Sequence, residues 1–307
     1  MLDCRPIIPD GLASSTLCLT GFSGYLGSHL LETMRTARIR PFLIPRPGNV
    51  LPPRQDADVA VPWMGPEDLA AQIARLDNPV ILNIAGHFIS RHVAGDIAAL
   101  VSGNLEFPLL IFEALKLSGH SRIVNVGTSW EYSDTGAEVP ANLYAQLKAA
   151  NARSLEWYAR EASLRAVNIK LNDTYGGNDT RSKLLPLLKN CWLDRQVARL
   201  RYAVQQVNLL HITDVQEGLL AAALRTADLN DQAVETAFLL SDNTVQLRGL
   251  TAFLTEKVAP GLSVRFEDMA EENATLRGVW DAAPRLANWH PRISLEDGFR
   301  DYFREEE

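Results

Sequence analysis

Tyr144 and Lys148 are the two residues of this sequence whose types and spacing best suit acid–base chemistry. If their segment is helical, side chains at this spacing share one face and the ammonium sits beside the phenol. A neighbouring ammonium stabilises the phenolate, so we expect Lys148 to lower the pKa of Tyr144 toward neutrality. Thr128 ends the preceding apolar run, where its hydroxyl would hydrogen-bond a reacting oxygen. These three residues are the predicted catalytic set.

The pair alone is weak evidence, because a tyrosine and a lysine at this spacing also occur on ordinary amphipathic helices. The glycine-rich stretch Thr20–Gly27 strengthens the interpretation. It follows the apolar run Leu17–Leu19, precedes a helical pattern, and carries glycine at every third position. A strand that turns through glycines into a helix presents free N–H groups and the positive end of the helix dipole, which suits a pyrophosphate.

This stretch therefore predicts a dinucleotide-binding loop, with a spacing that differs from the commonest glycine fingerprint. The alternative is a glycine-rich turn with no ligand. The loop residues predicted to contact the cofactor are Gly21, Phe22, Ser23, Gly24, Tyr25, Leu26 and Gly27.

The end of the second predicted strand indicates which dinucleotide binds. NAD-selective sites usually carry an acidic residue there, which binds the ribose hydroxyls. This chain has Arg46 at that place and no carboxylate before Asp56. A guanidinium suits a ribose 2′-phosphate, so we favour NADP(H) over NAD(H), the alternative being an ordinary surface arginine. Lys148 would also hold the nicotinamide ribose, and Thr128 would align the substrate for hydride transfer.

Strands and helices alternate through the first half of the chain, which predicts an α/β fold with a doubly wound parallel Rossmann sheet. The predicted strands are Thr16–Thr20, Pro41–Ile44, Val59–Val61, Val80–Ile84, Arg122–Val126 and Ala166–Leu171. The predicted helices run from the glycine loop to Arg35 and over Pro66–Leu76, Asp96–Ser118 and Asn142–Ala162. Ligands of such sheets bind beyond the carboxyl ends of the strands.

After Leu171 the pattern changes, and we expect a smaller, discontinuous C-terminal α/β lobe that covers the substrate. The expected elements are a loop over Asp173–Thr180, a helix over Lys183–Leu193, strands over Val207–Ile212 and Ala237–Leu240 returning to the sheet, a helix over Leu247–Val258, a strand over Ser263–Phe266 and a helix after Pro291. The dinucleotide domain would span residues 1–171 with a returning segment at about 205–240, and the lobe 172–204 and 241–307.

Composition excludes several classes of protein. The formal net charge of -7 argues against nucleic acid or an anionic membrane as the main partner. The cysteines Cys4, Cys18 and Cys191 are too scattered for a disulfide framework or a zinc site, and Cys18 reads as a core residue. We therefore expect no bound metal. Neither a signal peptide nor a segment long enough to span a bilayer is evident, so we expect a cytoplasmic protein.

Several motifs together resemble the extended short-chain dehydrogenases/reductases that act on nucleotide-linked sugars. They are the glycine loop, Leu82–Gly86, Asn104, Thr128, Tyr144 with Lys148, Asp173–Gly176, Leu210–Asp214 and Trp289–Glu296, and they cover nearly the whole chain. Within that family, Gly127–Trp130 and Lys170–Gly176 are most similar to CDP-abequose and CDP-paratose synthases, which reduce 4-keto-6-deoxyhexoses linked to a nucleotide diphosphate.

The resemblance implies that NADPH delivers hydride to the C4 ketone of the hexose and that Tyr144 protonates the new alkoxide. It implies cofactor contacts by Ala85, Gly86 and Asn104, and substrate contacts by His87, Ser129, Trp130, Asp173 and Lys183. The substrate would be linked to CDP or dTDP. In similar proteins the two long helices pair across a dimer axis, so a homodimer is also expected.

Departures from the wider family bear on the reaction. Sugar-nucleotide dehydratases carry an acid within two residues of the threonine, where this chain has Ser129 and Trp130. Glu131 would face away if the strand continues, so dehydration is disfavoured. Epimerases usually have an arginine where Val207 stands, which leaves the diphosphate clamp open. The basic residues that would replace it are Arg181, Lys183, Arg199 and Arg201.

Three functions remain open from the sequence. The first is a 4-ketoreductase of a nucleotide-linked deoxysugar, and the second is an epimerase on the same scaffold that recycles its cofactor. The third is a sensor that binds NADP without catalysis, which the intact Thr128, Tyr144 and Lys148 set disfavours.

Overall fold

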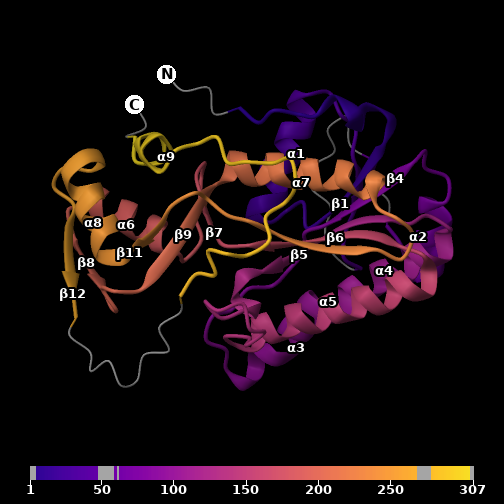
Figure 1. Cartoon of the computed structure of the whole chain (residues 1–307), viewed down its shortest axis with the longest axis horizontal. Helices are drawn as coiled ribbons and strands as arrows, with labels where there is room; N and C mark the ends of the chain where they lie inside the picture. The colour runs from indigo at the N-terminus through magenta and orange to yellow at the C-terminus, as the bar shows by residue number, and fades with distance from the viewer. Residues whose placement is uncertain (1–4, 48–58, 61, 268–277, 305–307) are drawn as a thin grey trace.

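The main sheet of the protein is parallel throughout, and helices cover both of its faces (Figure 1). The computed structural model describes residues 5–47, 59–60, 62–267 and 278–304. Its seven strands run in the order β10-β6-β5-β4-β1-β2-β3. Their bounds are β1 Thr16–Thr20, β2 Phe42–Ile44, β3 Val59–Ala60, β4 Pro79–Asn83, β5 Arg122–Thr128, β6 Arg165–Leu171 and β10 Val234–Leu239. The predicted doubly wound Rossmann sheet is confirmed. Cys4, Asp56 and Val61 lie outside the described residues.

Two helical layers bury the two faces of this sheet. The helices α1 (Tyr25–Thr36) and α7 (Ile212–Asp228) lie on one face, and α2 (Pro66–Ile73), α4 (Phe107–Ser118) and α5 (Leu143–Ala162) lie on the other (Figure 1). Side chains of β1 alternate between the layers, because Leu17 and Leu19 join the α1 and α7 core while Cys18 joins the opposite one. All three are fully buried, as an interior parallel strand requires, and Cys18 is a core residue as predicted.

A row of hydrogen-bonded side chains crosses the middle of the sheet. Thr20 donates to Asn83 at 3.0 Å, Asn83 to Asn125 at 2.9 Å and Asn125 to Asn168 at 3.1 Å. All four are buried, and each such group left unpaired would cost about 1–3 kcal/mol. Asn125 also donates to Asn151 of α5 at 3.1 Å. The row therefore fixes α5 against the strands whose ends it faces.

The long helix before β5 is continuous, but its helical type changes along its length. A 3-10 turn (Ala94–Asp96), α3 (Ile97–Val101), a π-helical turn (Ser102–Glu106) and α4 follow one another without a break. The resulting helix Ala94–Ser118 has 25 residues and a mean hydropathy of 1.4 in its most apolar window, of which 44% is buried. By length and composition it could therefore span a membrane, and the prediction that no segment is long enough was wrong. Its apolar face packs on α2, α5 and the sheet.

The second lobe has two small sheets of its own. One orders its strands β11-β9-β7 and the other pairs β12 with β8. The elements are β7 Asp173–Tyr175, α6 Leu184–Leu193, β8 Val197–Leu200, β9 Gln206–His211, β11 Thr244–Gln246, α8 Leu247–Phe253 continued by a π-helical turn at Leu254–Val258, β12 Ser263–Phe266 and α9 Leu295–Tyr302. Short 3-10 turns at Asp10–Ser14 and Ser129–Glu131 complete the described elements.

Two expectations for this lobe were wrong. The strand β9 does not return to the main sheet, because it pairs with β7 and β11, and β10 alone of the two predicted strands returns. Its pattern misleads because β9 is buried on both sides: Val207 and Leu209 join the lobe core, and Leu210 joins the main core. The expected loop after Leu171 begins with the strand β7.

Candidate active site

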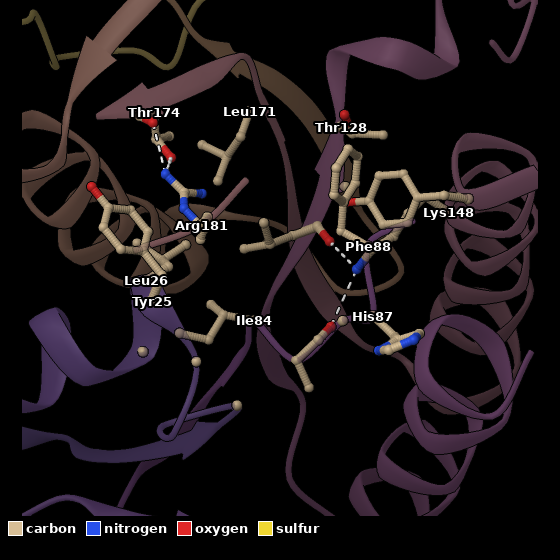
Figure 2. Close-up of a pocket in the computed structure, with 18 of the residues that line it drawn as sticks. Tyr25, Leu26, Ile84, His87, Phe88, Thr128, Lys148, Leu171, Thr174 and Arg181 are labelled. Atoms are coloured by element: carbon tan, nitrogen blue, oxygen red, sulfur yellow. Dashed lines mark hydrogen bonds between the residues drawn. The ribbon is translucent and has the colours of Figure 1, made fainter. Parts of the chain in front are cut away.

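A cavity of about 790 Å³ lies at the carboxyl end of the main sheet (Figure 2). It is bounded by the glycine loop, the segments after β2, β4, β5 and β6, the first turn of α5 and the approach to α6. Among the predicted site residues that line it are Gly21 to Gly27, Arg46, Ala85, Gly86, His87, Thr128, Trp130, Tyr144, Lys148, Asp173 and Lys183. The structure therefore gathers most of the predicted residues around one space, where ligands of parallel sheets bind.

The glycine loop is tightly packed at Gly21 and Gly27, where no side chain would fit. Gly21 has a φ of 67°, and a Cβ there would lie 2.8 Å from the Cα of Ala85. A Cβ on Gly27 would lie 2.1 Å from the carbonyl oxygen of Gly21. Gly24 begins α1 without a side-chain cap, so the helix N-terminus faces the cavity with backbone N–H groups alone. Such a cradle is suited to a pyrophosphate.

Lys148 is a buried residue in the wall of the cavity. Its Nζ donates to the carbonyl oxygens of Val126 at 2.9 Å and Ala85 at 3.2 Å, which joins the ends of β5 and β4 (Figure 2). Burial lowers the pKa of Lys148 to about 8, and the positive charges of Lys170 and Arg46 act in the same direction. The ammonium is thus held in place, but at an electrostatic cost.

Tyr144 lies at the start of α5, where Asn142 caps the helix by accepting the N–H of Ala145 at 2.9 Å. Burial, and then the negative charge of Glu131, raise the pKa of Tyr144. This contradicts the prediction that Lys148 lowers that pKa, because the Lys148 ammonium is directed to the two carbonyl oxygens. The raised pKa keeps the Tyr144 phenol protonated at neutral pH.

The segment after Thr128 turns away from the strand direction. Residues Ser129–Glu131 form a 3-10 turn, so the premise that the strand continues was wrong. Glu131 folds inward, accepts the N–H of Thr128 at 2.8 Å and forms a buried ion pair with Lys170 of β6. A Cβ on Gly127 would collide with this pair. Glu131 does not line the cavity, which agrees with the expectation that it faces away. The reason is the inward turn of its side chain and not its position on a strand.

Arg46 follows β2 and lines the cavity. Its guanidinium donates to the carbonyl oxygen of Gly103 at 3.4 Å and lies 5.5 Å from the ring of Phe107. These contacts hold the cation against the helix that precedes β5, at the wall of the cavity.

Asn104 supports the site from behind. Its side chain accepts the N–H of His87 at 3.0 Å and donates to the carbonyl oxygen of His87 at 2.8 Å. It is fully buried and does not line the cavity. Asn104 therefore fixes the loop that carries Ala85 and Gly86, and His87 of that loop lines the cavity.

Aromatic rings form the wall nearest Tyr144. The ring of Phe88 lies 5.1 Å from that of Tyr144 and 5.6 Å from that of Trp130, both edge to face. The Lys183 Nζ lies 3.9 Å from the Phe88 ring centre and 3.3 Å from a carboxylate oxygen of Asp173. Sequence reasoning missed Phe88, and its place soon after β4, next to the predicted Gly86 and His87, was the available signal.

Ser129 lies outside the main cavity. It lines a neighbouring cavity of about 240 Å³ together with Trp130, Asp173, Val207 and Trp280. Because Trp130 and Asp173 also line the larger cavity, the two spaces meet at these residues.

The remaining basic residues are already engaged. Arg181 bonds Asp179 at 2.7 Å and the Thr174 carbonyl oxygen at 2.8 Å, and stacks on Tyr25 (Figure 2). Arg199 and Arg201 do not line either cavity; they lie 3.8 and 3.6 Å from carboxylate oxygens of Glu267.

The described part of the chain contains no cluster of side chains that could bind a metal ion. No group of three or more His, Cys, Asp or Glu side chains among those residues could hold an ion. His211 caps α7 by accepting the N–H of Thr213 at 3.3 Å, and burial lowers its pKa to about 4. His211 therefore acts as a helix cap and is not a metal ligand in the described part of the chain.

Comparisons with known proteins agree with this architecture. A family model described as "NAD dependent epimerase/dehydratase family" matches residues 17–234. CDP-abequose synthase of Yersinia pseudotuberculosis is 25% identical over 287 residues, which cover 89% of this chain and 97% of that protein. MoeE5 in complex with UDP-glucuronic acid and NAD superposes with a TM-score of 0.76 at 16% identity, covering 94% of this chain and 97% of that one. The UDP-glucose 4-epimerase of Thermus thermophilus, in complex with NAD, gives 0.74 at 16% identity and the same coverage.

Proposed function

The chain belongs to the NAD dependent epimerase/dehydratase family, and from this premise we propose that it reduces the C4 ketone of a nucleotide-diphosphate-linked 4-keto-6-deoxyhexose with NADPH. The observation that carries the proposal is the protonation chemistry around Thr128. The protonated Tyr144 phenol lines the same cavity as Thr128, while the nearest acid in sequence, Glu131, is folded away. Reduction needs a proton donor at this place, and dehydration needs a carboxyl group that the wall after Thr128 lacks.

Similarity to a curated protein supports the same reaction class. CDP-abequose synthase matches almost end to end, and its name describes the synthesis of a nucleotide-linked sugar. A CDP- or dTDP-linked hexose is therefore the substrate proposed for this chain.

The cofactor proposed is NADP(H). Gly21, Gly24 and Gly27 form the cradle for the pyrophosphate, and Arg46 stands where it would bind a 2′-phosphate. When bound, the nicotinamide supplies the hydride.

The three catalytic residues have separable roles. Thr128 accepts the N–H of Trp130 at 3.3 Å, which leaves its own hydroxyl proton to donate to the ketone oxygen. Tyr144 gives its proton to the same oxygen as negative charge develops there. Lys148 is held to two strand ends by its bonds to the carbonyl oxygens of Ala85 and Val126, which keeps it in place to hold the nicotinamide ribose.

A homodimer is part of the proposal. Ile97, Leu117 and Trp157 leave between 44% and 49% of their surface exposed on the helical layer of α3, α4 and α5. Pairing of these helices with a second copy would bury those side chains. Sedimentation of the wild type and of Trp157→Glu tests this, with the variant expected to be monomeric.

The function is tested by NADPH consumption with 4-keto-6-deoxyhexoses linked to CDP, dTDP, GDP and UDP. Stoichiometric oxidation that Tyr144→Phe abolishes would support the reductase and identify the nucleotide. Interconversion of sugar isomers without net NADPH oxidation would identify an epimerase instead.

A further inference from the structure

We propose that Glu131 is a positioning residue of the reaction. From behind the cavity wall it holds the backbone of Thr128, and so it sets the direction in which the Thr128 hydroxyl meets the ketone oxygen. The inference rests on the proposed function, because it takes Thr128 to bind the reacting oxygen. Glu131 itself is 1% exposed and does not line the cavity, whereas Thr128 does (Figure 2).

The segment from Thr128 to Glu131 forms a capping box. In this motif an N-cap threonine accepts a backbone N–H of the first turn, and an acid three residues later accepts the N–H of the threonine. Thr128 Oγ1 accepts the N–H of Trp130 at 3.3 Å, and Glu131 Oε1 accepts the N–H of Thr128 at 2.8 Å. The box therefore fixes the backbone and the side chain of Thr128 together, and it leaves the hydroxyl proton to be donated.

Lys170 keeps Glu131 in this orientation. It lies directly across from Gly127 in the pairing of β5 with β6, and its ammonium forms a buried ion pair with Glu131 Oε2. Gly127 makes room for the pair, because a Cβ there would lie 2.5 Å from Glu131 Oε1 and 2.9 Å from Lys170 Nζ. One carboxylate oxygen thus binds Thr128 and the other binds Lys170, which leaves Glu131 a single orientation.

The charge of Glu131 also acts on the other two catalytic residues. After the larger effect of burial, it raises the pKa of Tyr144. Burial lowers the pKa of Lys148 to about 8, and the Glu131 carboxylate opposes that change. Both effects favour the protonated forms of the phenol and the ammonium. Glu131 therefore supports the whole catalytic set without lining the cavity.

Paired substitutions separate the hydrogen bond to Thr128 from the two charges. Loss of Glu131 alone would leave the Lys170 ammonium buried without compensation and would destabilise the fold. Glu131→Gln/Lys170→Met removes both charges but keeps an amide oxygen that can accept the Thr128 N–H. Glu131→Leu/Lys170→Met removes both charges and this acceptor as well. A difference between the two variants therefore reports the bond to Thr128.

Steady-state kinetics with the 4-keto-6-deoxyhexose that the wild type reduces test the inference. We expect kcat of Glu131→Leu/Lys170→Met to be about 10- to 100-fold below that of Glu131→Gln/Lys170→Met, because a hydroxyl displaced by about 1 Å loses its alignment with the ketone. KM for NADPH should be the same in both, since neither residue lines the cavity. The matched control is Glu138→Leu/Arg153→Met, which removes an ion pair with 36% and 65% of its side chains exposed and should leave kcat unchanged.

A double-mutant cycle shows whether Glu131 acts through Thr128. Thr128→Val removes the hydroxyl, so the two paired variants should have equal kcat in that background. A further 10-fold difference there, or equal kcat of the two while Thr128 is present, would overturn the positioning role and leave the reductase standing. Wild-type protein that reduces none of the four nucleotide-linked hexoses would overturn the proposed function, and this inference with it.

Discussion

Glu131 folds back beneath Thr128, and its Oε1 accepts the Thr128 backbone N–H at 2.8 Å. The same carboxylate pairs with Lys170, and the two side chains are 1% and 0% exposed. A charged pair so deeply buried stabilises the fold only while both partners are present. Here it also fixes the backbone of the residue proposed to orient the ketone.

Removing one partner of this pair should be costly. We expect Glu131→Ala to lower the free energy of unfolding by about 3–5 kcal/mol, because the Lys170 ammonium would be left buried and uncompensated. Urea denaturation followed by circular dichroism measures the loss. The double variant Glu131→Leu/Lys170→Met should recover most of it, since neither charge remains; a double variant as unstable as the single one would contradict this account.

Lys148 should give the cofactor-free protein a stability that rises with alkaline pH. Its pKa falls from 10.5 to about 8 on folding, so between these values the unfolded chain binds more protons than the folded one. Below pH 8 the full penalty for burying the ammonium applies, about 3 kcal/mol. As pH rises from 8 to 10.5, the wild type should gain unfolding free energy relative to Lys148→Met, which has no titrating group at this position. A pH-independent difference would contradict the lowered pKa.

Tyr144→Phe should reduce kcat of the ketone reduction about 10²- to 10⁴-fold, because the proton donor is lost. NADPH affinity should change little, since the ring remains. The matched control is Tyr158→Phe on the same helix, whose hydroxyl bonds Glu113 at 2.8 Å and does not line the cavity. Equal activity of both variants would exclude Tyr144 as the donor.

Arg46→Ala should raise KM for NADPH about 10- to 100-fold and leave KM for NADH nearly unchanged, because the guanidinium is proposed to bind only the 2′-phosphate. Steady-state kinetics with both cofactors at saturating substrate measure the ratio. Parallel increases for the two would show that Arg46 shapes the loop without selecting the cofactor.

The strands of the main sheet and the glycine loop were predictable from the sequence because their signals are local, whereas the short strands β7, β8 and β11 of the second lobe were not predicted. The bounds of Thr16–Thr20 and Ser263–Phe266 agree with the structure residue for residue. The helix α7 was missed because its residues are buried almost all round, Asp214, Gln216 and Glu217 included, which erases the amphipathic period. Its polar side chains are satisfied by distant partners such as Arg292, which no local pattern reveals.

Most of the residues predicted for the site line one cavity, but the predicted effect of Lys148 on the pKa of Tyr144 was wrong. The spacing of Tyr144 and Lys148 correctly places both on α5 at the cavity. It could not show that the Lys148 ammonium points to the carbonyl oxygens of Ala85 and Val126. The direction of the Tyr144 pKa shift follows from that orientation and from the buried Glu131, and both depend on contacts between separate strands.

Gly27→Ala should weaken NADPH binding, because the new Cβ would lie 2.1 Å from the Gly21 carbonyl oxygen, a backbone atom that cannot rotate away. Moving the loop would cost about 1–3 kcal/mol and separate the helix N-terminus from the cradle, so we expect NADPH to bind about 10- to 100-fold more weakly. Gly95→Ala is the control, since nothing lies within 4 Å of a Cβ there. Fluorescence titration of both variants with NADPH measures the effect. If Gly27→Ala bound NADPH as tightly as Gly95→Ala, the pyrophosphate would have to lie elsewhere than on this loop.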